Sequence, residues 1–282
     1  MKIEAPFRTE SGYVFPTLSV AYETMGRLNK SKDNVVLIEH AWTGDAHFAG
    51  DLSLPGIKPG WWQGAVGRGL GFDPTVDFLI CANVLGGCGG TTGPSSLNPQ
   101  TGHPYGSRFP VITIADMVHL QKVMLDRLGI RQLKCVAGGS MGGMQALQWA
   151  AAYPEMVDSI AVIAATAASS PMNIALNEIA RNAVRADPSW KDGDYYESGP
   201  PLKGLAAARM LGHITFLSNS TMWSKFGRRL QNNTRLSYTL EPEFEVESYL
   251  NYRGSQFIQR FDANSFMILT RSLDYFDMAP AG

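Results

Sequence analysis

The sequence predicts an α/β protein with a doubly wound, mostly parallel sheet and a helical cap. Three observations support this fold class. Segments of β and α character follow one another in the order β, β, α, β, α, β, as in parallel strands joined by helices. After about Ser170, helical patterns and polar loops replace the β-type segments. A glycine-rich turn connects one apolar run to a helical pattern near the middle of the chain.

The predicted strands differ in how they are covered. "LSVAYETMG" (18–26) alternates apolar and polar residues, which indicates a half-buried strand. "NVVLIEHA" (34–41) and "DFLICANVLG" (77–86) are continuous apolar runs, typical of strands covered on both faces. "QLKCVAGG" (132–139) and "SIAVIAATAAS" (159–169) are predicted to be further buried strands. We therefore expect helices on both faces of the sheet.

Two helices are predicted between these strands. Residues 113–130 place apolar side chains on one helical stripe: Ile114, Met117, Leu120, Val123, Met124 and Leu128. "MGGMQALQWAAAYPEMV" (141–157) is a second helical pattern, and the Tyr153-Pro154 step brings it towards its end.

The change of pattern divides the chain into a core, residues 1–170, and a mainly helical cap, residues 171–282. "MNIALNEIARNAV", "LAAARMLGHITFLS" and "SFMILTRSLDYF" supply the helical patterns of the second part. The alternative is that this part is simply the helical second half of one α/β domain.

Composition excludes several classes of function. The chain has 282 residues, 45% of them hydrophobic, and a net charge of −1, which argues against a nucleic-acid or membrane-surface protein. The first residues lack the apolar region of a signal peptide, and every apolar stretch is far shorter than the roughly 20 residues of a membrane span. Three cysteines without C-x-x-C spacing predict neither disulfides nor zinc. We expect a cytoplasmic protein without a metal or a permanently bound cofactor.

The turn "GGSMG" (138–142) fits the pattern G-x-S-x-G. A serine at a sharp strand-to-helix turn is pushed outward, and glycines two residues away avoid collisions with the neighbouring strand and helix. Ser140 is therefore a candidate nucleophile, and the Met141 N–H is a candidate oxyanion donor. The alternative is a turn that only packs a helix on a strand. A phosphate-binding loop is disfavoured, because no G-K-[ST] follows.

A second oxyanion donor is expected in the loop after an earlier strand, and the Trp42 N–H is the candidate. In proteins with this turn the catalytic order along the chain is serine, acid, histidine. His40, His47, His103 and His119 all precede Ser140 and are interpreted as structural.

Several stretches together resemble the homoserine O-acetyltransferase family of α/β-hydrolase-fold enzymes. They keep the family's order over nearly the whole chain: "HAWTGDAH" (40–47), "NVLGGCGGTTGPSS" (83–96), "FPVITIADMV" (109–118), "GGSMGGMQALQWA" (138–150) and "RFDANSFMILTRSLDYFD" (260–277). The family transfers an acyl group from acyl-CoA to the hydroxyl of L-homoserine, on the route to methionine. Related members use succinyl-CoA or acylate serine or deacetylcephalosporin. The resemblance also implies a homodimer formed through the cap helices.

The resemblance assigns roles to single residues. It makes Ser140 the nucleophile that accepts the acyl group, the Met141 and Trp42 amides the oxyanion hole, and Arg209 the group that holds the homoserine carboxylate. The family usually has leucine where this chain has Trp42, which changes the pocket wall but keeps the backbone donor. Phe216 stands where members often carry tyrosine, so a hydroxyl that could orient the substrate is absent. The loop around Cys88 is expected to shape the site entrance without direct chemistry.

A catalytic triad also needs a histidine and an acid after the serine. The last of the five histidines is His213, inside the expected cap. The family continues with strands that carry an aspartate and a Gly-His-Asp segment, so we expect this chain to be C-terminally incomplete and to lack those strands. Asp274 and Asp277 are poor candidates for the acid, because they match a helical segment of the family.

Three functions remain open at this stage. The first is acetyl transfer from acetyl-CoA to homoserine through Ser140. The second is ester hydrolysis, which shares every catalytic residue but lets water reach the acyl-enzyme. The third is an inactive fragment or a binding protein, with little or no turnover by the chain as given. The sequence does not decide between acetyl and succinyl donors, or between homoserine and serine as acceptor.

Overall fold

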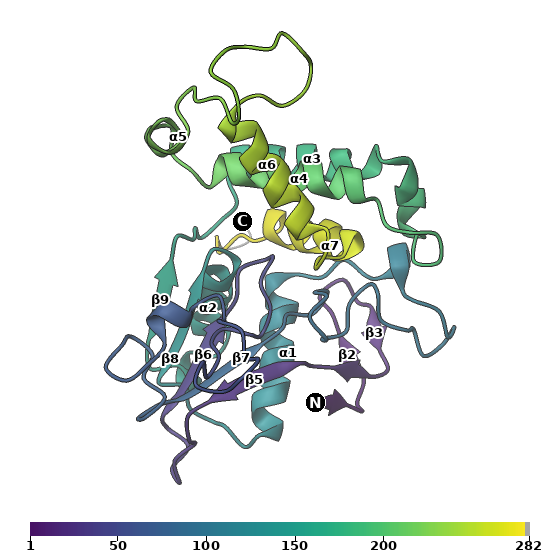
Figure 1. Cartoon of the computed structure of the whole chain (residues 1–282). Helices are drawn as coiled ribbons and strands as arrows, with labels where there is room; N and C mark the ends of the chain where they lie inside the picture. Colours follow the sequence, from purple (N-terminus) through teal and green to yellow (C-terminus); the bar gives the residue numbers. More distant parts are fainter. Residues whose placement is uncertain (280–282) are drawn as a thin grey trace. The chain divides into compact units, whose positions relative to one another are not determined.

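The computed structural model describes residues 1–279 and divides the chain into two compact units (Figure 1). The first unit consists of Met1–Ser170 together with the chain from Ser265 onward, and the second is Pro171–Asn264. The boundary after Ser170 coincides with the expected end of the core.

The first unit contains a five-stranded sheet in the order β5-β7-β6-β8-β9. Its strands are β5 (Tyr22–Met25), β6 (Val35–Glu39), β7 (Phe78–Ala82), β8 (Cys135–Gly139) and β9 (Ile160–Ile163). All neighbours are parallel except β5, which pairs antiparallel with β7. The mostly parallel sheet predicted from the sequence is therefore confirmed.

Two short antiparallel pairs precede this sheet. β1 (Lys2–Ile3) pairs with β4 (Leu18–Ser19), and β2 (Phe7–Arg8) pairs with β3 (Val14–Phe15). The single strand expected over 18–26 is thus divided between β4 and β5, which belong to different sheets. Between them, the Val20 N–H donates to the Met1 carbonyl and the Ala21 N–H donates to Thr91 Oγ1, so these residues bond outside the main sheet.

The helices of the first unit follow the predicted segments. They are α1 (Ile114–Arg127), α2 (Met141–Ala152) and α7 (Ala263–Asp274), whose first two residues belong to the second unit. Short 3-10 helices occur at Gln63–Ala65, Gly106–Arg108 and Pro154–Met156. Thr113 and Asp116 form a capping box that starts α1. Of the predicted α1 stripe, four members are buried, and Val123 and Leu128 are half-buried.

The two faces of the sheet are covered differently, which corrects the expectation of helices on both. α1 and α2 pack against each other, and α2 packs on β6, β8 and β9. On the opposite face, Val36 and Ile38 belong to a core cluster with Phe48, Ala49 and Val66. Those three residues come from the long connection between β6 and β7, which here takes the place of a helical layer.

β9 is not the buried strand that its apolar run predicted. Ile160 is 37% exposed and Ile163 is 49% exposed. β9 lies at the edge of the described sheet and pairs only with β8. An apolar run records the tendency of a segment to be covered, but it does not reveal whether a neighbour covers it.

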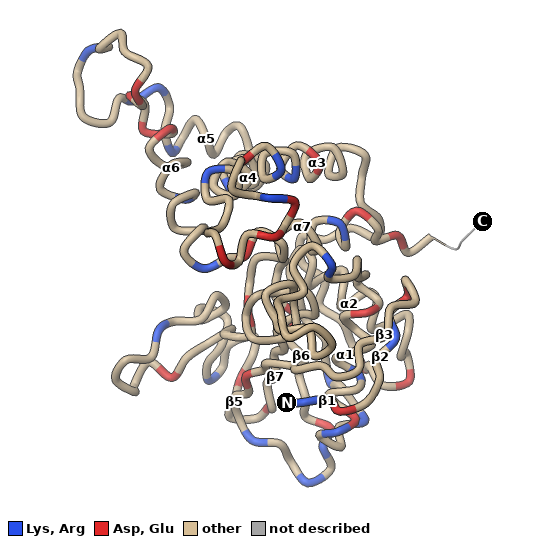
Figure 2. The backbone as a smooth tube through the Cα atoms, turned by 90° about the vertical axis from the view of Figure 1, so that its right-hand side faces the viewer, with Lys and Arg blue, Asp and Glu red and all other residues tan. Residues whose placement is uncertain are grey.

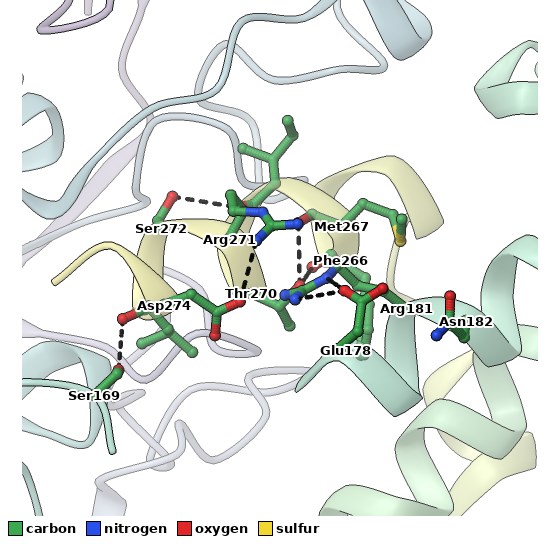
Figure 3. A network of polar contacts seen from close by, with 12 residues as sticks. Ser169, Glu178, Arg181, Asn182, Phe266, Met267, Thr270, Arg271, Ser272 and Asp274 are labelled. Atoms are coloured by element: carbon green, nitrogen blue, oxygen red, sulfur yellow. Dashed lines mark hydrogen bonds and ion pairs between the residues drawn. The ribbon is translucent and has the colours of Figure 1, made fainter. Parts of the chain in front are cut away.

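The second unit is helical, as predicted. Its helices are α3 (Pro171–Arg185), a 3-10 segment at Pro188–Gly193, α4 (Leu202–Thr215), α5 (Asn219–Lys225) and α6 (Glu245–Phe257). α4 packs closely on α3 and on α6. A Cβ on Gly204 would lie 2.4 Å from the Ala183 carbonyl oxygen, so glycine is what permits the α3–α4 approach. Within α3, Arg181 forms an ion pair with Glu178 at 2.8 Å (Figure 3).

The expected cap extended to residue 282, whereas the residues from Ser265 onward group with the first unit. Hydrogen bonds explain the difference. Ser272 Oγ donates to the Ile112 carbonyl at 2.7 Å, and Ser169 Oγ donates to the Leu273 carbonyl at 2.6 Å (Figure 3). The end of α7 is thereby attached to the core. The last three residues of the expected cap lie outside the described residues.

Glycines bring β8, α2 and β6 into close contact. A Cβ on Gly138 would lie 2.3 Å from the backbone of Gly142. A Cβ on Gly142 would lie 2.1 Å from the carbonyl oxygen of Glu39, at the end of β6. Both distances are far too short for real atoms, so any side chain at these positions would force the strand and the helix apart.

A buried polar network lies beside this junction. Gln121 Nε2 on α1 donates to Glu39 Oε2 at 2.8 Å and to Gln145 Oε1 on α2 at 2.9 Å, and Trp149 Nε1 donates to Gln121 Oε1. Glu39 Oε1 and Gln145 Nε2 have no partner among the described residues. Burial raises the pKa of Glu39 from its ordinary value of 4.5 to about 8. The carboxyl is therefore mostly protonated at neutral pH.

We expect Glu39→Gln to change how stability depends on pH. Because the folded-state pKa is raised to about 8, the parent should lose stability as pH rises from about 4.5 and should stop losing it above about 8. The total loss should be on the order of 3–5 kcal/mol. Glutamine keeps the shape of the hydrogen-bonding group but does not ionise. The stability of the variant relative to the parent should therefore increase as pH rises.

Urea unfolding at several pH values measures this difference. Glu4→Gln is the matched control, because Glu4 is exposed and its substitution should leave the pH curve of the parent in place. Parallel curves for the parent and Glu39→Gln would show that Glu39 is not held neutral in the folded protein.

A pair of alanine substitutions tests the glycine junction. Gly142→Ala should destabilise the protein by at least about 3 kcal/mol or prevent folding, because its Cβ would overlap the Glu39 carbonyl. Gly139→Ala is the neighbouring control, because its nearest contact would be an ordinary 3.8 Å, and it should cost less than about 1 kcal/mol. Soluble yield and urea unfolding measure both. Equal stability of the two variants would contradict the close approach.

Candidate active site

Ser140 occupies the turn between β8 and α2 in a backbone conformation that non-glycine residues rarely adopt, with φ 57° and ψ −122°. Its N–H donates to the Ile163 carbonyl at 2.9 Å, and its own carbonyl accepts from Gly143 N–H at 2.9 Å. The residue is exposed although the strand before it and the helix after it are largely buried. The turn therefore holds the serine rigidly and presents its side chain outward.

Met141 is the first residue of α2, and its side chain is fully buried. The first N–H groups of a helix have no acceptor within the helix, and they lie at the positive end of its dipole. The Met141 N–H therefore has the chemistry of an oxyanion donor directly after Ser140.

Trp42 lies in the loop that follows β6. β6 and β8 are paired neighbours, with Glu39 opposite Gly138, so the loop with Trp42 and the turn with Ser140 leave the sheet at the same edge. The half-buried Trp42 ring contacts the Phe266 ring at a centroid distance of 4.9 Å. The role of its N–H as the second oxyanion donor stays a prediction.

His40 is buried and engaged at both ring nitrogens. Nδ1 lies 2.8 Å from the Ala41 carbonyl, and Nε2 accepts from the Val84 N–H at 3.1 Å and faces the Asn83 side chain at 3.2 Å. Burial lowers its pKa. A neutral ring with both nitrogens occupied fits the structural interpretation of His40. The contact also shows that Asn83 helps to position His40, which the sequence analysis did not predict.

The other histidines also bond away from Ser140. His47 lies between Glu23 Oε2 at 2.8 Å and the Lys58 carbonyl at 2.9 Å. The ring of His119, an exposed residue on α1, bonds to Tyr153 OH. His103 is exposed, and in the second unit Tyr249 OH bonds His213. Within residues 1–279 no histidine is hydrogen-bonded to Ser140.

The glycine-rich loop after β7 folds around Asn83. Gly89 N–H donates to Asn83 Oδ1 at 3.0 Å, and Thr91 Oγ1 donates to the Asn83 carbonyl at 2.6 Å. A Cβ on Gly93 would lie 2.1 Å from the Gly87 carbonyl oxygen, so the loop also packs tightly on itself. Cys88 is half-buried within it. The loop is held by these internal contacts, and its role at the site entrance stays a prediction.

Arg209 lies on α4 in the second unit and is half-buried among aromatic rings. Its guanidinium carbon is 4.8 Å from the centre of the Phe257 ring and 5.8 Å from that of Phe216. Burial, with the charges of Arg260 and Arg253, lowers its pKa to about 10, so it remains protonated at neutral pH. Its carboxylate-binding role stays a prediction.

Asp274 and Asp277 have structural partners. Asp274 on α7 faces Arg271 at 3.7 Å (Figure 3). Asp277 forms an isolated bridge with Ala168, and its Oδ1 accepts from the Ala279 N–H. Neither pattern is that of an acid that orients a histidine.

Metal ligands and membrane-spanning helices are both absent from the described part of the chain. No group of histidine, cysteine, aspartate and glutamate side chains there is arranged to hold a metal ion. No helix there combines the length and apolar character needed to cross a membrane.

Comparisons with known proteins agree with this geometry. A family model described as alpha/beta hydrolase fold matches residues 34–274. The homoserine O-acetyltransferase of Methanococcoides burtonii is 53% identical over 99% of this chain, which spans only 57% of that relative's length.

Two solved structures have similar folds. The homoserine O-acetyltransferase of Bacillus anthracis has a TM-score of 0.89 and 31% identity, with 98% of this chain and 76% of that chain covered. Esterase E22 has a TM-score of 0.86 and 32% identity, with 98% of this chain and 77% of that chain covered. The fold, the Ser140 turn and these similarities show that the chain belongs to the homoserine O-acetyltransferase family of α/β-hydrolase-fold proteins.

Proposed function

We propose that this protein transfers an acetyl group from acetyl-CoA to the hydroxyl of L-homoserine, in methionine biosynthesis, through an acyl-enzyme on Ser140. The observation that carries the proposal is the strained, exposed Ser140 at the β8–α2 turn, which is the position of a nucleophile. The relatives named above support the acceptor and the acyl group. A cytoplasmic location and a homodimer belong to the same proposal.

The mechanism is a two-step transfer. Ser140 Oγ attacks the thioester carbonyl, and the Met141 and Trp42 amides stabilise the negative charge on the tetrahedral oxygen. Removal of one such donor typically costs about 3 kcal/mol in transition-state stabilisation. The proton of Ser140 passes through a base to the CoA sulfur, and CoA leaves as the thiol. The homoserine hydroxyl then attacks the acyl-serine carbonyl, and its proton passes through the base to Ser140 Oγ. The product leaves as an ester of homoserine, and Ser140 is regenerated.

Proton transfer from Ser140 needs a base. Because this chain spans 57% of its relative's length, we propose the full reaction for the whole protein. To the residues described here we assign the nucleophile, the two amide donors and the arginine that holds the carboxylate.

Arg209 suits the acceptor substrate. A guanidinium presents two parallel donors to a carboxylate, and the contact with the Phe257 ring restricts where the Arg209 side chain can lie. Partial burial strengthens its attraction for an anion by reducing competition from water.

Ester hydrolysis is the second candidate, and the similarity to esterase E22 is the observation that favours it. The two reactions share the acyl-enzyme and differ in the group that attacks it. Saturating homoserine and an acetyl donor separate them, because transfer yields O-acetylhomoserine and hydrolysis yields free acetate. Hydrolysis that remains faster than transfer under these conditions would favour the esterase.

Ser140→Ala should abolish the rapid acetylation of the protein, because it removes the hydroxyl that the β8–α2 turn presents beside the first N–H groups of α2. The probe is p-nitrophenyl acetate, whose good leaving group reduces the need for a catalytic base. Peptide mass spectrometry after a short incubation measures the acetylated site. Ser53→Ala, at an exposed loop serine, is the control and should acetylate like the parent. Equal acetylation of Ser140→Ala and the parent would exclude Ser140 as the nucleophile.

Arg209→Lys should raise KM for homoserine at least tenfold, roughly the value of one charge-assisted hydrogen bond, because an ammonium cannot form the bidentate pair. Acetylation of Ser140 in the absence of homoserine should not change. Steady-state kinetics of the whole protein and acetylation by mass spectrometry measure the two effects. An unchanged KM would remove Arg209 from the acceptor site.

A further inference from the structure

Cationic and aromatic side chains converge on one ring in the second unit. Lys225 Nζ, at the end of α5, lies 4.5 Å from the centre of the Tyr249 ring, and the Arg253 guanidinium lies 5.3 Å from it. His213 on α4 packs perpendicular to the same ring and bonds its hydroxyl at 3.0 Å. With Arg209, these residues form what we call the α4–α6 basic cluster, and Figure 2 marks the Lys and Arg positions on these elements.

The charges in this cluster act on one another. Burial, followed by the charges of Arg209, Arg253 and Lys225, lowers the pKa of His213 to about 4. Arg253 is also one of the charges that lower the pKa of Arg209. Three positive side chains, Arg209, Arg253 and Lys225, therefore act together on His213. Like charges gathered in this way repel one another, and an anion bound between them relieves the repulsion.

Lys225 and Arg253 are available to such an anion. Both side chains are exposed, and within residues 1–279 neither forms an ion pair with a carboxylate. Other arginines of the same unit are paired: Arg181 and Arg185 with Glu178, and Arg229 with Glu245. The Tyr249 ring holds the two cations on a common support through cation–π contacts, which reduces the entropy lost when they close on a ligand.

The chemistry of these groups selects the ligand. One carboxylate is satisfied by one guanidinium, and Arg209 already fills that role in the proposed reaction. A further ammonium and a further guanidinium fit a group with more negative charge and more acceptor oxygens, which describes a phosphate or a diphosphate. The donor substrate of the proposed reaction carries such groups on its nucleotide portion.

We propose that Lys225 and Arg253 form a phosphate-binding subsite that holds the nucleotide phosphates of acyl-CoA, with Tyr249 as their common support. The identity of the carrier rests on the proposed function, whereas the affinity for phosphate rests on the cluster alone. The subsite adds two specificity residues for the donor, distinct from the arginine assigned to the acceptor.

Binding measurements on the full chain test the subsite directly. Isothermal titration with inorganic pyrophosphate, CoA and pantetheine separates the phosphates from the rest of the carrier. We expect CoA to bind at least about tenfold more tightly than pantetheine, pyrophosphate to compete with CoA, and both affinities to fall as salt rises.

Lys225→Gln and Arg253→Gln should each weaken CoA and pyrophosphate about fivefold to tenfold and leave pantetheine unchanged. Arg235→Gln, at an exposed arginine outside the cluster, is the matched control and should bind like the parent. Equal melting temperatures confirm that the variants fold. Unchanged CoA affinity in both cluster variants, or equal affinity of the parent for CoA and pantetheine, would overturn the proposal.

The experiment also separates this proposal from the proposed function. If Ser140 is not acetylated but CoA binding still depends on Lys225 and Arg253, the reaction is wrong and the subsite stands. If Ser140 is acetylated from acetyl-CoA with equal efficiency in the parent and both cluster variants, and their CoA affinities are also equal, the reaction stands and the subsite is wrong.

Discussion

The candidate site depends on one contact, in which the backbone of Gly142 lies against the carbonyl of Glu39. This contact allows α2 to begin directly beside the end of β6. With α2 in that place, the chain between β8 and α2 must turn within a single residue, and Ser140 takes the positive φ that such a turn demands. The strain at Ser140 is thus imposed by packing on both sides and is stabilised by the core around it.

The side chain of Glu39 connects β6 to the helices of the core through hydrogen bonds. A fully buried carboxyl is costly when ionised, and the raised pKa shows that the fold meets this cost by keeping Glu39 neutral. Its bond to Gln121 links β6 to α1, and Gln121 links onward to Gln145 on α2. Low dielectric strengthens each of these bonds. A network of hydrogen bonds therefore links β6, α1 and α2 beneath the turn that carries the candidate nucleophile Ser140.

Local features were predictable from the sequence, and features that depend on distant partners were not. The glycines around Ser140 revealed the turn, because their spacing reflects collisions within a few residues. Glu39 was included in the apolar run over 34–41, and the sequence pattern did not show that its carboxyl is buried and protonated. The exposure of β9 and the cover supplied by the β6–β7 connection depend on tertiary neighbours. The role proposed for Arg209 comes from the family resemblance, whereas Lys225 and Arg253 come together only through the fold.

The proposed anion-binding groups differ between the two units: backbone amides in the first unit and charged side chains in the second. This difference matches the roles proposed for them. The donors proposed for the oxyanion beside Ser140 are backbone amides, which are uncharged dipoles with a fixed direction. They stabilise an oxyanion as it forms but attract a substrate anion only weakly, so their effect falls mainly on the transition state. Full charges such as Lys225 and Arg253 bind a phosphate equally in the ground and transition states. These charges increase the affinity for the substrate. They are best placed against a part of the substrate that does not react, because binding there holds the substrate without stabilising its reacting groups.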